Sequence, residues 1–155
     1  MNDPGVGLFA RRSDRLDRWI QFGMAGGKVI KVDFPLDRPA EAASEHTVLD
    51  RLGHYLDDGT EDDFRDIDIA LTGPTDYRPV YDAVREIPYG TQANVETIAE
   101  RALGSNEDDA AIGTVREALR ANPVPVLVPD HRIQDVTGST PTAVREVLRS
   151  IEGLS

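Results

Sequence analysis

The first third of the chain alternates apolar and polar side chains in three short runs. These runs cover residues 7–11, 16–22 and 28–34, and segments rich in Ser, Asp and Gly separate them. Period-two alternation is typical of strands with one buried face, and the separating residues favour turns. We therefore predict a small antiparallel sheet that ends at Pro35.

Apolar residues recur at helical spacing in later parts of the chain. Gly59 follows the first such segment and Gly104 the third, each as a natural C-terminal stop. Asp76 and Thr140 are suited to cap the second and the last helix, and Pro141 fits the first helical position. The predicted helices cover residues 46–58, 77–87, 94–102, 106–120 and 141–151.

Two of these helices, residues 94–102 and 106–120, are joined by a short turn that contains glycine, and this arrangement predicts a helix-turn-helix. Ser105 with Asp108 resembles a capping box at the start of the second one. Residues 124–129 are apolar and bounded by prolines, and we expect them to be extended.

These elements predict an α+β protein with two domains. Residues 1–72 would form a small domain of an antiparallel sheet and a helix, and residues 73–155 a mostly helical domain with the helix-turn-helix. The acidic stretch 57–68 has no recognisable ligand spacing, so we interpret it as a solvated connector and expect no metal site.

The composition indicates the salt conditions to which the protein is adapted. The 155 residues include 28 acids and 17 Lys or Arg, for a net charge of −11, and 18 of the acids are Asp while only two cations are Lys. This bias suggests a halophilic protein. In molar salt the Debye length falls to about 3 Å, so the acid excess does not exclude a nucleic acid.

The chain has no cysteine, which excludes disulfides and thiolate zinc sites. No apolar run approaches the ~20 residues of a membrane span, and the first residues lack the features of a secretion signal. We therefore expect a cytoplasmic protein without a membrane partner.

Three motifs carry a resemblance to a known family. They are the segment Ile87-Pro88-Tyr89-Gly90-Thr91 before the helix-turn-helix, the pair Asn122-Pro123, and the block Pro129-Asp130-His131-Arg132-Ile133. Together they resemble the DNA alkylguanine-cysteine alkyltransferases, which flip an O-alkylated guanine out of the duplex and move its alkyl group to the cysteine of a Pro-Cys-His-Arg motif. The resemblance implies double-stranded DNA with alkylated guanine as partner, and no cofactor.

The resemblance fails at three positions and one loop that carry the family's chemistry. Asp130 stands where the family has its nucleophilic cysteine, and Val95 where it has a tyrosine that helps to flip the base. Gly113 stands where it has the arginine that fills the hole in the duplex. The loop that forms one wall of its guanine pocket shrinks here to residues 137–141.

Other family positions are retained. By resemblance, His131 and Glu152 would belong to the machinery that activates the cysteine, and Asn122 would act as a hinge. Arg116 and Arg120 share one helix face and are the best candidates for DNA contact, while Arg145 and Arg149 resemble a solvated face. The positions assigned to a DNA interface are Arg116, Arg120, Gly113, Val95 and Arg132.

Alkyl transfer in this family needs a thiolate, and this chain has none. We therefore predict an alkyltransferase-like DNA-binding protein related to repair of O-alkylated guanine, with repair proteins as further partners. Asp130 would organise a turn, by accepting backbone N–H groups or by pairing with Arg132, and His131 would bond to Glu152. Two alternatives stay open: an interaction module that has lost DNA binding, and alkyl transfer to Asp130 itself.

Overall fold

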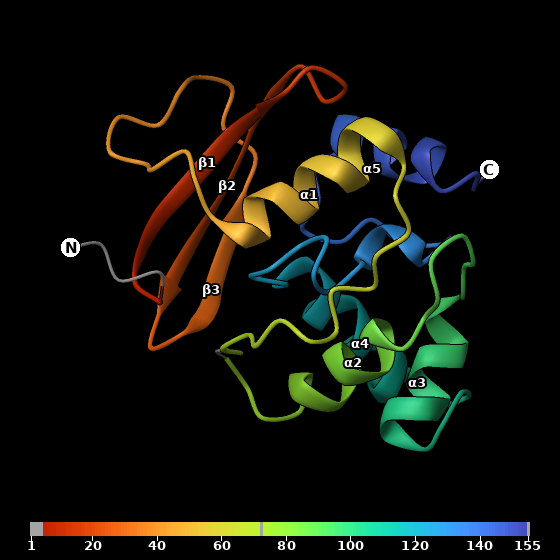
Figure 1. Cartoon of the computed structure of the whole chain (residues 1–155). Helices are drawn as coiled ribbons and strands as arrows, with labels where there is room; N and C mark the ends of the chain where they lie inside the picture. Colours follow the sequence, from red (N-terminus) through yellow and green to blue (C-terminus); the bar gives the residue numbers. More distant parts are fainter. Residues whose placement is uncertain (1–4, 72, 155) are drawn as a thin grey trace. The chain divides into compact units, whose positions relative to one another are not determined.

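The computed structural model describes residues 5–71 and 73–154, and the chain divides after Ala70 into two units (Figure 1). Residue 72, after which we placed the domain boundary, lies outside the described residues. Each unit is described by itself. Together their elements confirm the predicted α+β class.

Unit 1 contains a three-stranded antiparallel sheet in the order β1-β2-β3, as predicted. The strands are β1 (Gly7–Ser13), β2 (Arg18–Ala25) and β3 (Lys28–Asp33). Phe9 pairs with Phe22, which in turn pairs with Val32, and all three side chains are buried on one face. The alternation therefore sets the buried face of the sheet.

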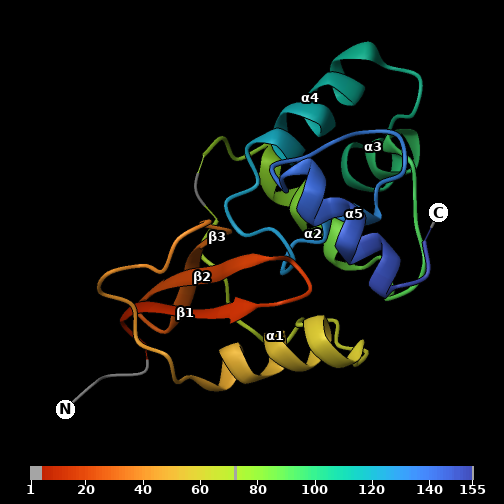
Figure 2. The ribbon, with the colours of Figure 1, turned by 90° about the horizontal axis from the view of Figure 1, so that it is seen from above.

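Helix α1 (Thr47–Asp58) follows the sheet and packs on it (Figure 2). His46 caps its first turn, where the Nδ1 atom accepts a 3.0 Å hydrogen bond from the Val48 amide. Gly59 ends the helix in the left-handed conformation, with a φ of 69° that glycine adopts without strain. Both boundaries agree with the helix expected over residues 46–58.

The acidic segment after α1 is more ordered than the solvated connector that we predicted. The guanidinium of Arg51 donates to Asp62 at 2.9 and 2.7 Å and to Asp66 at 2.9 and 2.8 Å. Phe64 lies between these two aspartates in the sequence and is 1% exposed. The segment is therefore anchored by a buried ring and by a guanidinium that holds two carboxylates.

Unit 2 is mainly helical. Its elements are α2 (Tyr77–Arg85), α3 (Val95–Leu103), α4 (Asp109–Arg120), the short 3-10 helix η1 (Asp130–Arg132) and α5 (Thr142–Ile151). Helices α2, α3 and α4 pack against one another. The helix-turn-helix is thus formed by α3 and α4, which a turn at Gly104 separates.

Helix α4 begins three residues later than we predicted. Ser105 does accept a 3.2 Å hydrogen bond from the Asp108 amide, but the N-cap is Asp108, whose carboxylate accepts from Ala110 at 2.9 Å. Helix α3 begins about where we expected it, and Asn94 is its N-cap, since its side chain accepts from the Thr97 amide at 2.8 Å. Asp76 stands at the N-cap of α2 but makes no side-chain cap bond.

Two further predictions for unit 2 are wrong. Residues 124–129 form a turn instead of a strand, because Val126 has a φ of 76° and the Val128 amide donates to the Val124 carbonyl at 2.9 Å. Helix α5 begins at Thr142 with Pro141 in the cap position. Thr140 does not cap it, because its hydroxyl is bonded elsewhere, to Asp130.

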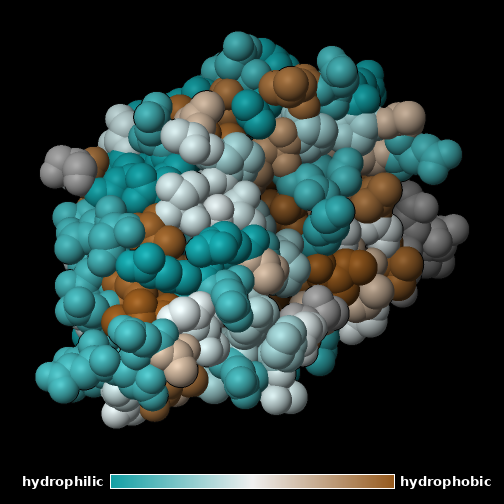
Figure 3. All heavy atoms as spheres, turned by 180° about the vertical axis from the view of Figure 1, so that it is seen from behind, coloured by the Kyte–Doolittle hydropathy of each residue, from teal (hydrophilic) through white to brown (hydrophobic). Residues whose placement is uncertain are grey.

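The surface reflects the charged composition. On the face shown in Figure 3, hydrophilic side chains cover much of the area, with smaller apolar areas between them. Among the described residues, no helix is both long and apolar enough to cross a lipid bilayer.

Candidate functional site

The η1 turn of unit 2 buries three consecutive charged or polar side chains. Asp130, His131 and Arg132 are 0, 0 and 2% exposed. The segment before α3 holds the turn from one side, since the Ala93 amide donates to the Arg132 carbonyl at 2.9 Å and its carbonyl accepts from Gln134 at 2.9 Å. A buried site with this much polar chemistry needs a partner for every group.

Both carboxylate oxygens of Asp130 accept hydrogen bonds. Oδ1 accepts a 2.6 Å bond from the Thr140 hydroxyl. Oδ2 accepts from the Asn122 amide at 2.9 Å, and from the backbone amide and hydroxyl of Ser139 at 3.2 and 3.3 Å. Asp130 thus accepts a hydrogen bond from a backbone N–H, which is the first of the two interactions that we predicted for it.

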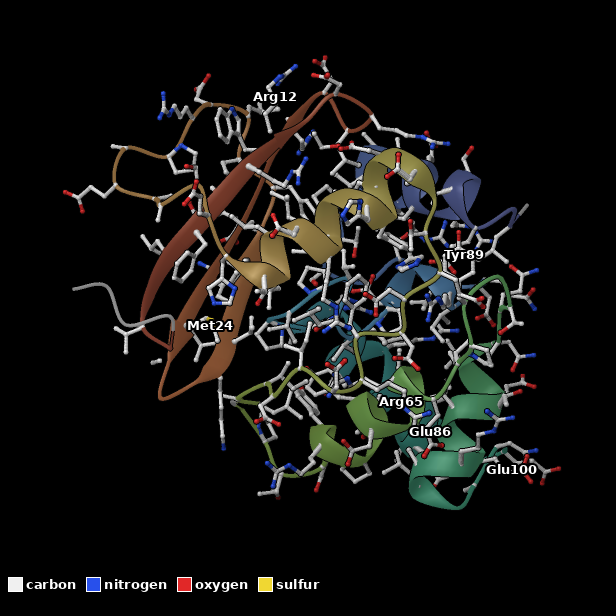
Figure 4. All side chains as sticks on the ribbon, viewed as in Figure 1. Arg12, Met24, Arg65, Glu86, Tyr89 and Glu100 are labelled. Carbon is white, nitrogen blue, oxygen red and sulfur yellow. The ribbon has the colours of Figure 1, made fainter. Side chains whose placement is uncertain are left out.

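The other prediction for Asp130, an ion pair with Arg132, is wrong. Arg132 instead donates to Glu152, from Nε to Oε1 at 2.7 Å and from a terminal nitrogen to Oε2 at 3.1 Å. Its second terminal nitrogen donates to the Ile87 carbonyl at 2.8 Å. Arg132 also lies 5.9 Å from the ring centroid of Tyr89, a residue of the connection from α2 to α3 that Figure 4 labels.

Glu152 is the centre of a second buried cluster. In addition to Arg132, it accepts a 3.0 Å bond from the Gly90 amide and lies 2.6 Å from Nε2 of His131, which confirms the predicted contact between the histidine and the glutamate. Burial alone would raise the pKa of Glu152, but the hydrogen bonds from His131 and Arg132 outweigh it and lower the pKa to about 2. Because the carboxylate is ionised, Nε2 of His131 is the donor in this contact.

Asn122 fixes the turn that leads to η1. Its side-chain amide donates to the Val128 carbonyl at 2.9 Å as well as to Asp130, and its carbonyl oxygen accepts from the Val124 amide at 3.0 Å. All of its side-chain groups are therefore engaged within eight residues of chain. The side chain is 3% exposed.

The arginines of α5 are wrongly predicted as a solvated face. Arg149 is 8% exposed and donates to the His131 carbonyl at 2.9 Å and to the Gln92 side chain at 2.6 Å. Burial is the main reason that its pKa is lowered. Arg145 donates to the Ile133 carbonyl at 2.8 Å. Both arginines therefore hold the backbone around η1, a role that their charge alone did not indicate.

The predicted DNA contacts fall into two groups. Arg116 and Arg120 are exposed on α4, and Gly113 lies half-exposed on the same helix, where an added Cβ atom would meet nothing within 4 Å. Val95 and Arg132 are 1 and 2% exposed, so neither can touch a duplex in this conformation. We correct those two assignments because burial excludes the contact.

The N-terminus of α3 holds an acidic side chain that the sequence reasoning missed. Asp135 accepts a 3.0 Å hydrogen bond from the Val95 amide, and the Asn94 side chain occupies the Thr97 amide. Free amides at a helix N-terminus favour phosphate. Here a carboxylate already takes that place, as the Asp108 carboxylate does at the N-terminus of α4, so neither helix offers free amides of this kind to a phosphate.

In the part of the chain that the structure describes, no group of three or more His, Cys, Asp or Glu side chains is arranged to hold an ion. Within the site, the His131 and Glu152 side chains contact each other, and Glu152 also accepts from Arg132.

Unit 2 contains the residues that match a known protein family. Residues 76–152 match the family profile described as "6-O-methylguanine DNA methyltransferase, DNA binding domain". The methylated-DNA–protein-cysteine methyltransferase of Methanothermobacter thermautotrophicus is 37% identical over 87 residues, or 56% of this chain and 46% of that protein. The protein of the same name from Methanopyrus kandleri is 34% identical over 101 residues, or 64% of this chain and 72% of that protein.

This chain spans about half the length of the first curated relatives that it matches. Its fold is similar to that of Mycobacterium tuberculosis OGT crystallised in complex with DNA, with a TM-score of 0.71 at 18% identity over 94% of this chain and 92% of that chain. The profile match, the relatives and the fold agree with the motifs found in the sequence. The chain belongs to the methylated-DNA–protein-cysteine methyltransferase family, and it contains no cysteine.

Proposed function

We propose that this protein binds double-stranded DNA through the helix-turn-helix of unit 2 and does not transfer an alkyl group. The matched family profile covers α2 to α5, and its description names a DNA-binding domain. Arg116 and Arg120 are exposed on one face of α4 and supply two cations for phosphate contact. DNA that contains O-alkylated guanine is the proposed target, and proteins of excision repair are the proposed further partners.

The enclosure of Asp130 is the observation that carries the proposal against transfer. Its side chain is fully buried, and four hydrogen bonds reach its two oxygens. An alkyl acceptor needs an electron pair directed at the alkyl carbon and an open line of approach. Asp130 offers neither, and a carboxylate oxygen is a poor nucleophile toward such a carbon.

Incubation with a methylated duplex followed by mass spectrometry tests the absence of transfer. We expect the peptide with Asp130 to keep its unmodified mass. A cysteine-containing relative serves as positive control, and a methyl-sized mass increase on the Asp130 peptide of this protein would refute this part of the proposal.

Fluorescence anisotropy with labelled duplexes tests the binding. Plain and O-methylguanine duplexes are titrated over a series of KCl concentrations up to molar, because phosphate contacts weaken as salt rises. We expect binding that weakens with KCl, with preference for the methylated duplex if the lesion is the target. Equal affinity for both duplexes would indicate a general duplex-binding protein.

Variants of α4 identify the interface. Arg116→Ala and Arg120→Ala are expected to weaken binding and to lower the salt slope by about 1 for each phosphate that is no longer neutralised, while Arg116→Lys keeps most of the affinity. Arg65→Ala removes an exposed arginine from unit 1 (Figure 4) and serves as the charge-matched control. Equal reductions of affinity in Arg65→Ala and the α4 variants would point to a general charge effect.

The alternative is an interaction module that keeps the scaffold without DNA binding. Asp108 and Asp109 at the start of α4, together with Asp135 at α3, favour it, because they place negative charge beside the helix-turn-helix. A folded protein that binds neither duplex at any KCl concentration would support this alternative and exclude the first proposal.

A further inference from the structure

Residues 137–141, which we call the strap, form the last part of the connection from η1 to α5 and lie against Asp130. Three of its groups donate to that carboxylate: the Thr140 hydroxyl and the hydroxyl and amide of Ser139. The Ser139 amide also donates to the Leu119 carbonyl at the end of α4, at 2.9 Å. The strap is therefore tied both to η1 and to the helix-turn-helix.

Gly138 shows how closely the strap approaches the carboxylate. A Cβ atom added at this position would lie 2.6 Å from both Cγ and Oδ2 of Asp130, closer than real Cβ contacts allow. Glycine is required here for its lack of a side chain, because the backbone packs directly on the carboxylate. Thr140, the next anchor, is 1% exposed.

The donors to Asp130 agree with this packing. They are an amide group, a backbone N–H and two hydroxyls. The two carboxylate oxygens have about four lone-pair sites, so these four donors fill them.

We propose that Asp130 holds the strap closed, and that the closed strap keeps a nucleobase away from the η1 turn. A purine lying against Asp130 would have to displace the Gly138 backbone and break the bonds from Ser139 and Thr140. For DNA recognition this inference rests on the proposed function. It implies that the protein binds the duplex while every base stays in the stack. Gly113 agrees, since it provides no side chain to fill the gap that an extruded base leaves.

Amide hydrogen exchange of the strap tests the anchor without DNA. Thr140→Val removes one donor to Asp130 and keeps the shape of the side chain. We expect amides 138–140 to exchange at least about tenfold faster in this variant, because one of the three hydrogen bonds from the strap to Asp130 is removed. Thr91→Val, which removes an exposed hydroxyl bonded to the Pro88 carbonyl, is the matched control and should leave strap exchange unchanged.

Asp130→Asn is the second variant. It replaces one acceptor oxygen by an NH2 group, which would face the donors of Asn122, Ser139 and Thr140. Faster exchange confined to the strap is expected here too. If strap exchange in Thr140→Val equals that of the wild type while the protein is folded, the anchor is wrong, whatever Asp130→Asn does.

A duplex with 2-aminopurine next to the O-methylguanine tests whether that base leaves the stack. 2-Aminopurine becomes more fluorescent when it loses a stacking partner, so the wild type is expected to bind with no increase in fluorescence. An increase on binding would overturn the closed strap and leave the proposed DNA binding intact. Absence of binding would instead refute the proposed function, and the exchange experiment would still decide on the anchor.

Discussion

Arg132 and Glu152 are joined by two hydrogen bonds of 2.7 and 3.1 Å, although 20 residues separate them in the chain. This pair connects η1 to the end of α5, and the Gly90 amide brings the turn after α2 to the same carboxylate. The side chain of Glu152 is 0% exposed and that of Arg132 3%. Three segments of unit 2 therefore meet at one buried charge.

We expect Glu152→Gln to destabilise the protein by about 3 kcal/mol, because it leaves Arg132 and the Nε2 donor of His131 without their anionic partner in a buried site. Urea unfolding followed by circular dichroism measures this decrease in stability. Glu146→Gln, which changes an exposed glutamate on the same helix, should have an effect within about 0.5 kcal/mol of zero. Equal stabilities of the two variants would show that the buried cluster contributes little.

The same carboxylate predicts a pH dependence. The pKa of Glu152 is lowered from an ordinary value of 4.5 to about 2, so its contribution to stability is complete above pH 4.5 and is lost as pH falls toward about 2. The whole contribution is on the order of 3 kcal/mol. We expect the stability gap between the wild type and Glu152→Gln to narrow over that range. A gap that stays constant down to pH 2 would contradict the assignment.

We expect substitution by alanine to have opposite effects on stability at two glycines. Gly113→Ala should stabilise the protein by about 0.5–1 kcal/mol, because the space around it in α4 is open and alanine is the better helix former. Gly138→Ala should destabilise it by about 1–3 kcal/mol, because the new methyl group meets the Asp130 carboxylate. Thermal unfolding measures both, and a stable Gly138→Ala protein would contradict the close packing of the strap.

The acid excess predicts a dependence on salt. With a net charge of −11, repulsion between carboxylates should destabilise the protein in dilute buffer and fade as the Debye length shortens from about 10 Å at 0.1 M to about 3 Å at 1 M. We expect the free energy of unfolding to rise steadily with KCl over this range. Equal stability at both ends would remove the support for salt adaptation.

The features that were predicted correctly depend on local chemistry. Gly59 and Gly104 end helices because they adopt the left-handed conformation, and Asn94 begins one because its side chain reaches an amide three residues ahead. The contact between His131 and Glu152 came from the family resemblance, since nothing local connects these residues. Periodicity also predicted the strands and the buried face of α1.

The features that were missed depend on tertiary contacts. Prolines around residues 124–129 are compatible with a strand or a turn, and the positive φ of Val126 has no sequence signal. Charged residues such as Arg149 normally lie on the surface, and only the fold reveals the carbonyl that it contacts. The anchors of Asp130 were missed for the same reason, because Ser139 and Thr140 are residue types that ordinary loops contain.

The donors around Asp130 form a binding site for a carboxylate, and in this protein that carboxylate is part of the chain. Asp130→Ala would remove the carboxylate and leave the donors of Asn122, Ser139 and Thr140 facing an empty space of its size. Formate has the same acceptor atoms and no side chain to place. It should therefore bind there and restore part of the missing stability, so the acceptor atoms at this position can be supplied from solution.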